Sequence, residues 1–300
     1  MKIQSILPLS LLASCSLASA AFEIKETPGA HIDILDGGKV VARMMTAHDT
    51  STPEKLHETY KVYTHVFDAE GKEPITKGAG GKFTHHRGIY IGWSKTKFDG
   101  KSVDSWHMKN CFQVYQKTLK AEAGEDSATL TALIHWVSKD GGVFIEEERT
   151  QTFTRGGEGA MLQVDFDTVL KAPLADVELN GDPEHAGCQF RPSNAVAENK
   201  SAKYLFPSDE VDLKKDRDLP WAAESFKIGD KLYFAQHMSH PTVPKGNIYS
   251  AYRDYGRFGA FCVDTIPKGE SLRLRYRFLV GEGEMPTREF FAKRSEAFAK

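Results

Sequence analysis

Short alternations of apolar and polar residues, separated by turn-forming residues, dominate the chain. Two such runs, residues 128–137 and 143–153, are joined by the tetrapeptide Lys139-Asp140-Gly141-Gly142. A period of two is typical of strands with one buried face, and Asp-Gly or Gly-Gly between two runs favours a hairpin. About a dozen runs of this kind lie between residues 22 and 282. The pattern predicts an all-β protein, a large antiparallel β-sandwich.

One convincing helical pattern lies at the C-terminal end. Phe290, Phe291 and Phe298 are separated by charged residues, and Thr287 stands where a helix cap is expected. Residues 172–230 are the least regular part of the chain, and long irregular segments in a compact domain are usually functional or mobile. We expect a single sandwich domain over residues 21–300 that ends in a short helix.

The N-terminal 20 residues have the features of a secretion signal. Lys2 is followed by an apolar stretch, and Ala18-Ser19-Ala20 resembles a signal-peptidase site. A second interpretation stays open, because Leu12-Ala13-Ser14-Cys15 resembles a lipobox, in which Cys15 would carry a lipid anchor. Both interpretations predict export to the periplasm, the outer membrane or the extracellular space.

Charge and motifs exclude several classes of protein. A net charge of −2 over 300 residues gives no electrostatic footprint for nucleic acid. After the signal, no apolar run approaches the roughly 20 residues of a transmembrane helix. A Walker loop, a Rossmann fingerprint and a G-x-S-x-G elbow are all missing from the sequence. No organic cofactor is indicated.

The most informative segment runs from Phe83 to His107. It holds His85, His86, Arg87 and His107 together with Trp93 and Trp106, next to Gly80-Gly81 and Gly88. Imidazoles bind metals or move protons near neutral pH, guanidinium groups hold anions, and indole faces stack on sugar rings. Adjacent residues of a regular strand point to opposite faces, so His85 and His86 share a site only if the backbone is irregular there.

Five motifs in a fixed order resemble a known family. They are Tyr63-Thr64-His65-Val66-Phe67-Asp68, His85-His86-Arg87-Gly88 with Gly92-Trp93, Asp104-Ser105-Trp106-His107, Gly187-Cys188-Gln189-Phe190-Arg191-Pro192 and Tyr252-Arg253-Asp254-Tyr255-Gly256. Together they resemble the secreted bacterial proteins labelled "methane oxygenase (PmoA-like)", across nearly all of the mature chain. The label does not describe this sequence, because true particulate methane monooxygenase subunits are membrane proteins. The resemblance implies a β-sandwich similar to the galactose-mutarotase-like supersandwich, in a companion of sugar-degrading systems.

Candidate catalytic residues are His85, His86 and Glu148. One of the two histidines would face the cleft as the acid or base. Alternation along residues 143–153 puts Glu146 and Glu148 on one strand face and Glu147 on the other. If the open face of the sheet forms the cleft, Glu146 or Glu148 is the best-placed carboxylate for acid or base work.

Candidate substrate-binding residues have side chains suited to sugar hydroxyls, acidic groups or ring faces. They are Arg87, Trp93, Trp106, His107, Gln189, Arg191, His237, Arg253 and Tyr255. Ion pairs for the arginines and core positions for the tryptophans are the structural alternatives. His237 belongs to an isolated H-x-x-H, which is a weak metal signal by itself.

These residues predict an exported carbohydrate-active protein. We expect an enzyme with an epimerase-, lyase- or hydrolase-like reaction on a small-molecule or oligosaccharide substrate. Two alternatives stay open. One is a non-catalytic carbohydrate-binding sandwich, which would need exposed tryptophans. The other is a protein that binds a divalent metal through His85, His86, His107 or His237.

Overall fold

The computed structural model describes residues 21–300. The predicted signal sequence and Cys15 lie outside the described residues. Within them, the chain folds into three antiparallel sheets and three short helices.

The first sheet has eight strands. In spatial order they are β1 (Phe22–Thr27), β2 (His31–Asp36), β3 (Lys39–Met45), β4 (Tyr63–Val66), β5 (Ile89–Trp93), β13 (Ala186–Phe190), β18 (Phe258–Phe261) and β17 (Ile248–Ser250). Its central strands come from distant parts of the sequence, since β13 pairs with β5 on one side and with β18 on the other.

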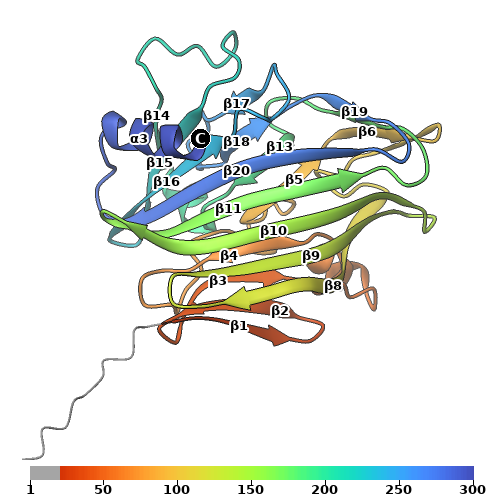
Figure 1. Ribbon diagram of the computed structural model, residues 1–300, viewed down its shortest axis with the longest axis horizontal. Coiled ribbons are helices and arrows are strands. Elements are labelled where there is room, and N and C mark those ends of the chain that lie inside the picture. The colour runs from red at the N-terminus through yellow and green to blue at the C-terminus, as the bar shows by residue number, and fades with distance from the viewer. Residues whose placement is uncertain (1–20) are drawn as a thin grey trace, which may run out of the picture.

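The second sheet also has eight strands, most of them longer. The order is β14 (Lys203–Leu205), β15 (Trp221–Ile228), β16 (Lys231–Ser239), β20 (Ser271–Glu282), β11 (Ala160–Lys171), β10 (Val143–Gly157), β9 (Ser127–Ser138) and β8 (Cys111–Ala123). Its long strands run side by side across the molecule (Figure 1). A small third sheet has the order β19 (Asp264–Ile266), β12 (Val177–Asn180), β6 (Lys95–Phe98) and β7 (Lys101–Val103).

The two large sheets pack face to face, as the alternating pattern predicts. Along β9 every second residue from Ala128 to Trp136 is fully buried, while the residues between them are partly exposed. Trp136 meets Trp93 of the first sheet, with ring centroids 6.2 Å apart. Phe278 of β20 meets Phe190 of β13 in the same way, at 6.3 Å. The prediction of an all-β antiparallel sandwich is therefore confirmed.

The core also contains one buried ion pair. Arg149 donates from Nε and Nη2 to the two carboxylate oxygens of Glu147, at 2.7 and 2.9 Å. Trp136 and Thr168 donate to the same carboxylate, and Arg149 Nη1 donates to the carbonyl oxygen of Val62, directly before β4 of the facing sheet. The Glu147 carboxylate and the Arg149 guanidinium group both have hydrogen-bond partners, so the pair links the two layers without leaving an unpaired charge.

The helices are short and lie outside the sandwich core. The C-terminal helix α3 (Arg288–Phe298) begins after Thr287, whose hydroxyl accepts from the Phe290 amide, as the sequence predicts. It lies beside β14–β16 (Figure 1), with Phe291 and Phe298 packed onto the second sheet. Two further helices, α1 (Pro53–Thr59) and α2 (Asn194–Asn199), were not expected, since each is too short to show a helical period.

Breaking the buried ion pair should destabilise the sandwich. Replacing Arg149 with methionine leaves the Glu147 carboxylate buried without its partner, so we expect a loss of about 3–5 kcal/mol in the free energy of unfolding. Urea unfolding measures it. Arg273→Met is the matched control, since Arg273 pairs with Asp167 at the exposed surface and its loss should cost about 0–1 kcal/mol. Equal losses in the two variants would contradict this role of the pair.

Candidate functional site

The outer face of the first sheet is unusually polar for a covered surface. Along β5 and β13 the residues Ile89, Ile91 and Cys188 point into the sandwich core, so Tyr90 and Gln189 point outward. Tyr90 is fully buried there, in a separate cluster with Tyr63 and Trp106. Something must therefore cover this face.

A layer of loops provides the cover. It consists of residues 78–88, 104–109, 181–185 and 251–257, which we call the loop layer. The turn at residues 104–107 lies directly against the sheet, because a Cβ at Gly92 would stand 2.2 Å from the carbonyl oxygen of Ser105. Glycine at position 92 is what permits this approach.

Three partly buried histidines meet in the loop layer, and we call them the histidine cluster. His85 comes from the first segment, His107 from the second and His185 from the third. Ring centroids are 4.3 Å apart for His85 and His107, 5.0 Å for His107 and His185, and 6.5 Å for His85 and His185. Three segments that are distant in sequence thus present imidazoles to one place.

Two of these histidines are oriented by aspartates in the same way. Asp104 Oδ2 lies 2.7 Å from Nδ1 of His107, and Asp182 Oδ1 lies 2.9 Å from Nδ1 of His185. Both pairs are three residues apart, and in both turns the aspartate also accepts a backbone amide. A carboxylate at Nδ1 holds the proton there and leaves Nε2 as the basic nitrogen.

Aromatic side chains surround the cluster. His86 lies beneath it, 4.3 Å from His85 and 6.3 Å from Trp106 by ring centroids. Phe83 stacks on His86 at 5.4 Å and contacts Tyr255 at 4.5 Å. Phe83 is 37% exposed and has a φ of 54°, a left-handed conformation that is strained for a bulky residue. Such strain is concentrated at ligand-binding segments.

Buried basic side chains hold the loop layer in place. Lys61 donates to the carbonyl oxygens of His85 and Trp106, at 2.9 and 2.6 Å. Arg87 reaches the carbonyl oxygens of Thr84, His86 and His57.

The remaining members of this group are Lys77, Arg191 and Arg257. Lys77 and Arg191 also donate to loop carbonyls, whereas Arg257 donates to the side chains of Gln189 and Ser250. None of the five basic groups forms an ion pair with a carboxylate of residues 21–300. The guanidinium groups among them therefore place positive charge against the loop layer without an ion-pair partner in that range.

Burial and this charge keep His85 and His86 neutral. Burial lowers the pKa of His85 to about 3, helped by His107, Lys61 and His185. Burial, His85 and the nearby arginines hold the pKa of His86 well below its usual value. Lys61 is affected in the same direction, since burial and Arg87 lower its pKa strongly. Burial acts to raise the pKa of Asp104, but hydrogen bonds from His107 and two amides outweigh it and lower that pKa.

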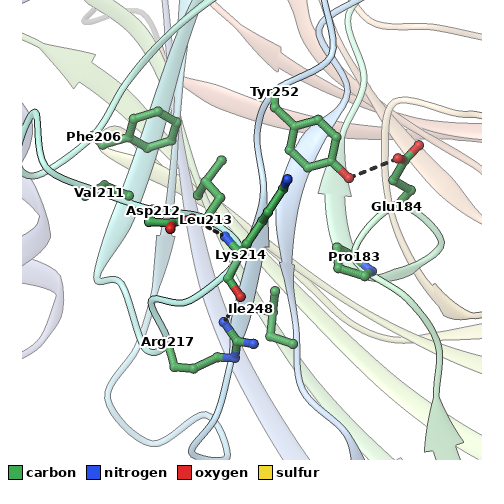
Figure 2. Close-up of a pocket in the computed structure, with 10 residues that line it drawn as sticks. All are labelled: Pro183, Glu184, Phe206, Val211, Asp212, Leu213, Lys214, Arg217, Ile248 and Tyr252. Carbon is green, nitrogen blue, oxygen red and sulfur yellow. Dashed lines mark hydrogen bonds between the residues drawn. The ribbon is translucent and has the colours of Figure 1, made fainter.

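A pocket of about 690 Å³ adjoins the histidine cluster, and we call it the side pocket. Its lining comprises Pro183, Glu184, Phe206, Val211, Asp212, Leu213, Lys214, Arg217, Ile248 and Tyr252 (Figure 2). Glu184 directly precedes His185 of the cluster and accepts hydrogen bonds from Tyr252 and Arg253. The volume lies in the range of small-molecule sites.

A family model described as "Family of unknown function (DUF6807)" matches residues 31–295. The chain belongs to this family. The description names no activity, so the methane-oxygenase label stays a resemblance and export stays a prediction. A comparison with curated proteins finds no match.

Several solved structures are similar in part. A mutant heparan sulfate lyase from Pedobacter heparinus has a TM-score of 0.45 at 8% identity, over 88% of this chain and 37% of that one. A Glycoside Hydrolase Family 97 enzyme variant from Pseudoalteromonas sp. strain K8 has a TM-score of 0.45 at 11% identity, over 82% and 34%. A GH36 alpha-galactosidase variant from Geobacillus stearothermophilus has 0.39 at 8% identity, over 89% and 40%.

Each of these neighbours is named for an activity on carbohydrates, and each is much longer than the present chain. The chain spans between 34% and 40% of their lengths. At this identity and these TM-scores, the likeness carries no activity over to this protein.

The structure brings some predicted site residues together. His85, His86, His107, Trp106 and Tyr255 all lie in the loop layer within ring contact of one another or of a shared neighbour. The irregular backbone expected at the two adjacent histidines is present, since the pair lies in a turn where the His86 amide donates to the Phe83 carbonyl.

The three predicted arginines reach this layer in different roles. Arg87 and Arg191 are fully buried and hold loop carbonyls, so they do not face a ligand directly. Arg253 is exposed and pairs with Glu184 beside the side pocket. Gln189 is buried on the outer sheet face, where it accepts from Arg257.

Three predicted residues lie elsewhere. Trp93 is fully buried in the sandwich core and donates to the Cys262 carbonyl. His237 is fully buried between the sheets, bonded to Tyr249 and the Cys188 carbonyl. Glu148 is exposed on β10 of the second sheet, and its neighbour Glu147 has the buried role instead. Spacing along a strand indicates which residues share a face, but not which face meets the loops.

Reasoning from the sequence missed His185, its partner Asp182, and Asp104. The available signal was the repeated D-x-x-H spacing, Asp104 to His107 and Asp182 to His185. For the alternative of a metal-binding protein, the structure shows no group of three or more His, Cys, Asp or Glu side chains within residues 21–300 that is arranged to hold a metal ion. The same part of the chain contains no helix with the length and hydropathy to cross a membrane.

The neutral histidines should make the fold sensitive to acid. Burial lowers the pKa of His237 to about 3 and that of His65 to about 4, so between these values and about 6.5 only the unfolded chain binds the protons. The contribution of these neutral histidines to the free energy of unfolding is therefore fully present above pH 6.5 and decreases as the pH drops. For fully buried His237 the loss from pH 6.5 to 5 is about 2 kcal/mol.

Urea unfolding between pH 7 and 5 checks this pH range, in which carboxylates with ordinary pKa values near 4 contribute little. His237→Gln should be less stable at pH 7 but should show a weaker dependence on pH. A free energy of unfolding that is constant or rises from pH 6.5 to 5 would show that the buried histidines are not kept neutral.

Proposed function

We propose that this protein is an exported enzyme that transfers protons on a carbohydrate substrate at the histidine cluster. The observation that carries the proposal is a neutral imidazole, His85, in one cluster with two histidines whose Nδ1 atoms are held by Asp104 and Asp182. An acid and a base that act on one substrate must reach the same place, and three imidazoles from separate segments do so here.

The roles follow from the hydrogen bonds. Nε2 is the basic nitrogen of His107 and of His185, because each carboxylate retains the proton on Nδ1. Neutral His85 lies beside His107, with the ring centroids 4.3 Å apart, and its Nε2 has no partner among the described residues. In our proposal Nε2 of one imidazole takes a proton from the substrate, which makes that ring an imidazolium. The proton then returns to the substrate or its leaving group, from the same ring or through a neighbouring imidazole, so the cluster regains its starting state.

The surrounding charge favours epimerase-like or lyase-like chemistry over hydrolysis. Removing a proton from carbon beside a carbonyl or carboxyl group places negative charge on oxygen, which buried cations stabilise. Retaining or inverting glycoside hydrolysis usually uses two carboxyl groups that flank the bond. At the cluster the two carboxylates, Asp104 and Asp182, are engaged with histidines.

Exposed aromatic residues support a carbohydrate as the substrate. Phe83 and Tyr252 are 37% and 45% exposed, one beside His86 and the other in the side pocket. Aromatic faces combined with fixed polar groups suit the apolar faces and hydroxyls of sugar rings. A purely binding module would have needed exposed tryptophans, whereas Trp93 and Trp106 are fully buried.

Loss of His85 tests the catalytic role. With an oligosaccharide that the wild-type protein converts, His85→Ala should lower kcat by about 10²–10⁴-fold with little change in KM, as expected for an acid–base group. Solvent deuterium incorporated at a sugar carbon, followed by NMR, reports the proton transfer. His135→Ala is the matched control, since His135 is partly buried on β9 of the second sheet.

Three results would contradict the proposal. The first is a loss of about tenfold or less that appears in KM, which fits a single hydrogen bond to the substrate. The second is inactivation by a chelator with recovery on adding a divalent ion, which would support the metal alternative. The third is binding of oligosaccharides without turnover of any, which would support a binding module.

Export is tested separately. We expect the native mature protein to begin at Ala21 or at a lipidated Cys15, and intact mass spectrometry of protein from the source cells distinguishes the two. Recovery of the full-length chain from the cytoplasm as the major species would contradict both.

A further inference from the structure

The side pocket continues the histidine cluster along two segments of the loop layer. Glu184 lines the pocket and is followed at once by His185, and Tyr252 lines it next to Arg253. The Tyr252 hydroxyl and the Arg253 guanidinium both bond to the Glu184 carboxylate. A ligand held in the pocket would therefore lie against the same turn that positions a cluster histidine.

The acidic residues of the pocket are already neutralised. Glu184 forms an ion pair with Arg253, and its pKa is lowered because the hydrogen bonds from Arg253 and Tyr252 outweigh the effect of burial. Asp212 forms an ion pair with Lys215 at 3.3 Å and accepts the Lys214 amide at 3.0 Å. Neither carboxylate is left to attract a cation.

The basic residues of the pocket have no such partner. Lys214 and Arg217 form no ion pair with a carboxylate in the described part of the chain. Arg217 donates from Nη1 to the carbonyl oxygens of Lys214 and Asp216. Figure 2 shows the Lys214 side chain crossing the pocket with its ammonium group toward Tyr252.

The rest of the lining is apolar. Phe206, Leu213 and Ile248 line the pocket together with Tyr252. The pocket thus combines apolar surface and a tyrosine ring with two positively charged side chains that form no ion pair within residues 21–300. A neutral sugar would leave both charges unused, whereas an anionic group on a sugar ring would pair with them.

We propose that the side pocket binds an acidic sugar residue, through a carboxylate or sulfate group held by Lys214 and Arg217. This inference rests on the proposed function, because it places a charged residue of the same oligosaccharide beside the histidine cluster. The buried arginines of the loop layer act in the same direction, since a positive field raises the local concentration of an anionic ligand.

Calorimetric binding to matched oligosaccharides tests the inference. The carboxylate probe is trigalacturonate against its methyl ester, and the sulfate probe is a chondroitin sulfate tetrasaccharide against its desulfated form. We expect at least one acidic probe to bind about tenfold or more tightly than its counterpart, with affinity that falls as salt is added.

Substitutions test whether Lys214 and Arg217 cause the preference for an acidic probe. Lys214→Met/Arg217→Met should remove the preference for the acidic probe, while Lys227→Met retains it. Lys227 is a fair control because it is an exposed lysine of β15 that does not line the pocket. Exposed positions of this kind leave folding intact.

The outcomes separate this inference from the proposed function. Equal binding of acidic and neutral probes, no binding of either acidic probe, or a preference that survives the double substitution would each overturn the acidic-sugar assignment. Turnover of a neutral oligosaccharide with no charge preference would overturn it while the proton-transfer proposal stands. A charge preference lost in the double variant, without turnover of any probe, would support the pocket and contradict the enzyme.

Discussion

The loop layer depends on hydrogen bonds from buried basic side chains to backbone carbonyls. Loops lack the repeating ladder that fixes strands, so their carbonyl groups need other donors when water is excluded. Lys61 and Arg87 supply such donors to the segment that carries His85 and His86. Arg191 supplies one to the Tyr255 carbonyl. Without these contacts the aromatic and imidazole rings would have no fixed position over the sheet.

The same contacts determine the chemistry of the site. Burial lowers the pKa of His85 and His86, and the basic groups nearby, which donate to carbonyls rather than to carboxylates, lower it further. Neutral imidazoles in a positive environment are suited to accept protons from a substrate while the cations favour negative charge on it. Holding the loops and tuning the histidines are thus two results of one arrangement.

The sequence was sufficient for the fold because periodicity is a local property. Alternation along residues 128–137 and 143–153, with a glycine turn between them, determines both strands and their hairpin. The candidate site was harder to predict from the sequence. His85 and His107 stood out by composition, but His185 meets them only because β13 is inserted beside β5, a pairing that no local pattern encodes.

Trp93 and His237, which were predicted to bind substrate, show the same limit of prediction from the sequence. Each has a residue type common in binding sites, yet each points into the sandwich. Both are the inward members of an alternating pair, and the sequence does not state which side of a sheet the loops will cover. The face is determined by the packing of the whole sandwich.

Lys61 has a consequence for how the protein loses its structure. One ammonium group binds the backbone of both the His85 segment and the Trp106 turn, so these two segments should open as one cooperative unit. The sandwich beneath is held by long strands and a large apolar core, and its global unfolding does not require that unit to stay closed. Heat should therefore separate the histidines of the cluster before the sheets come apart, so the loss of the site and the loss of the fold become two distinct events.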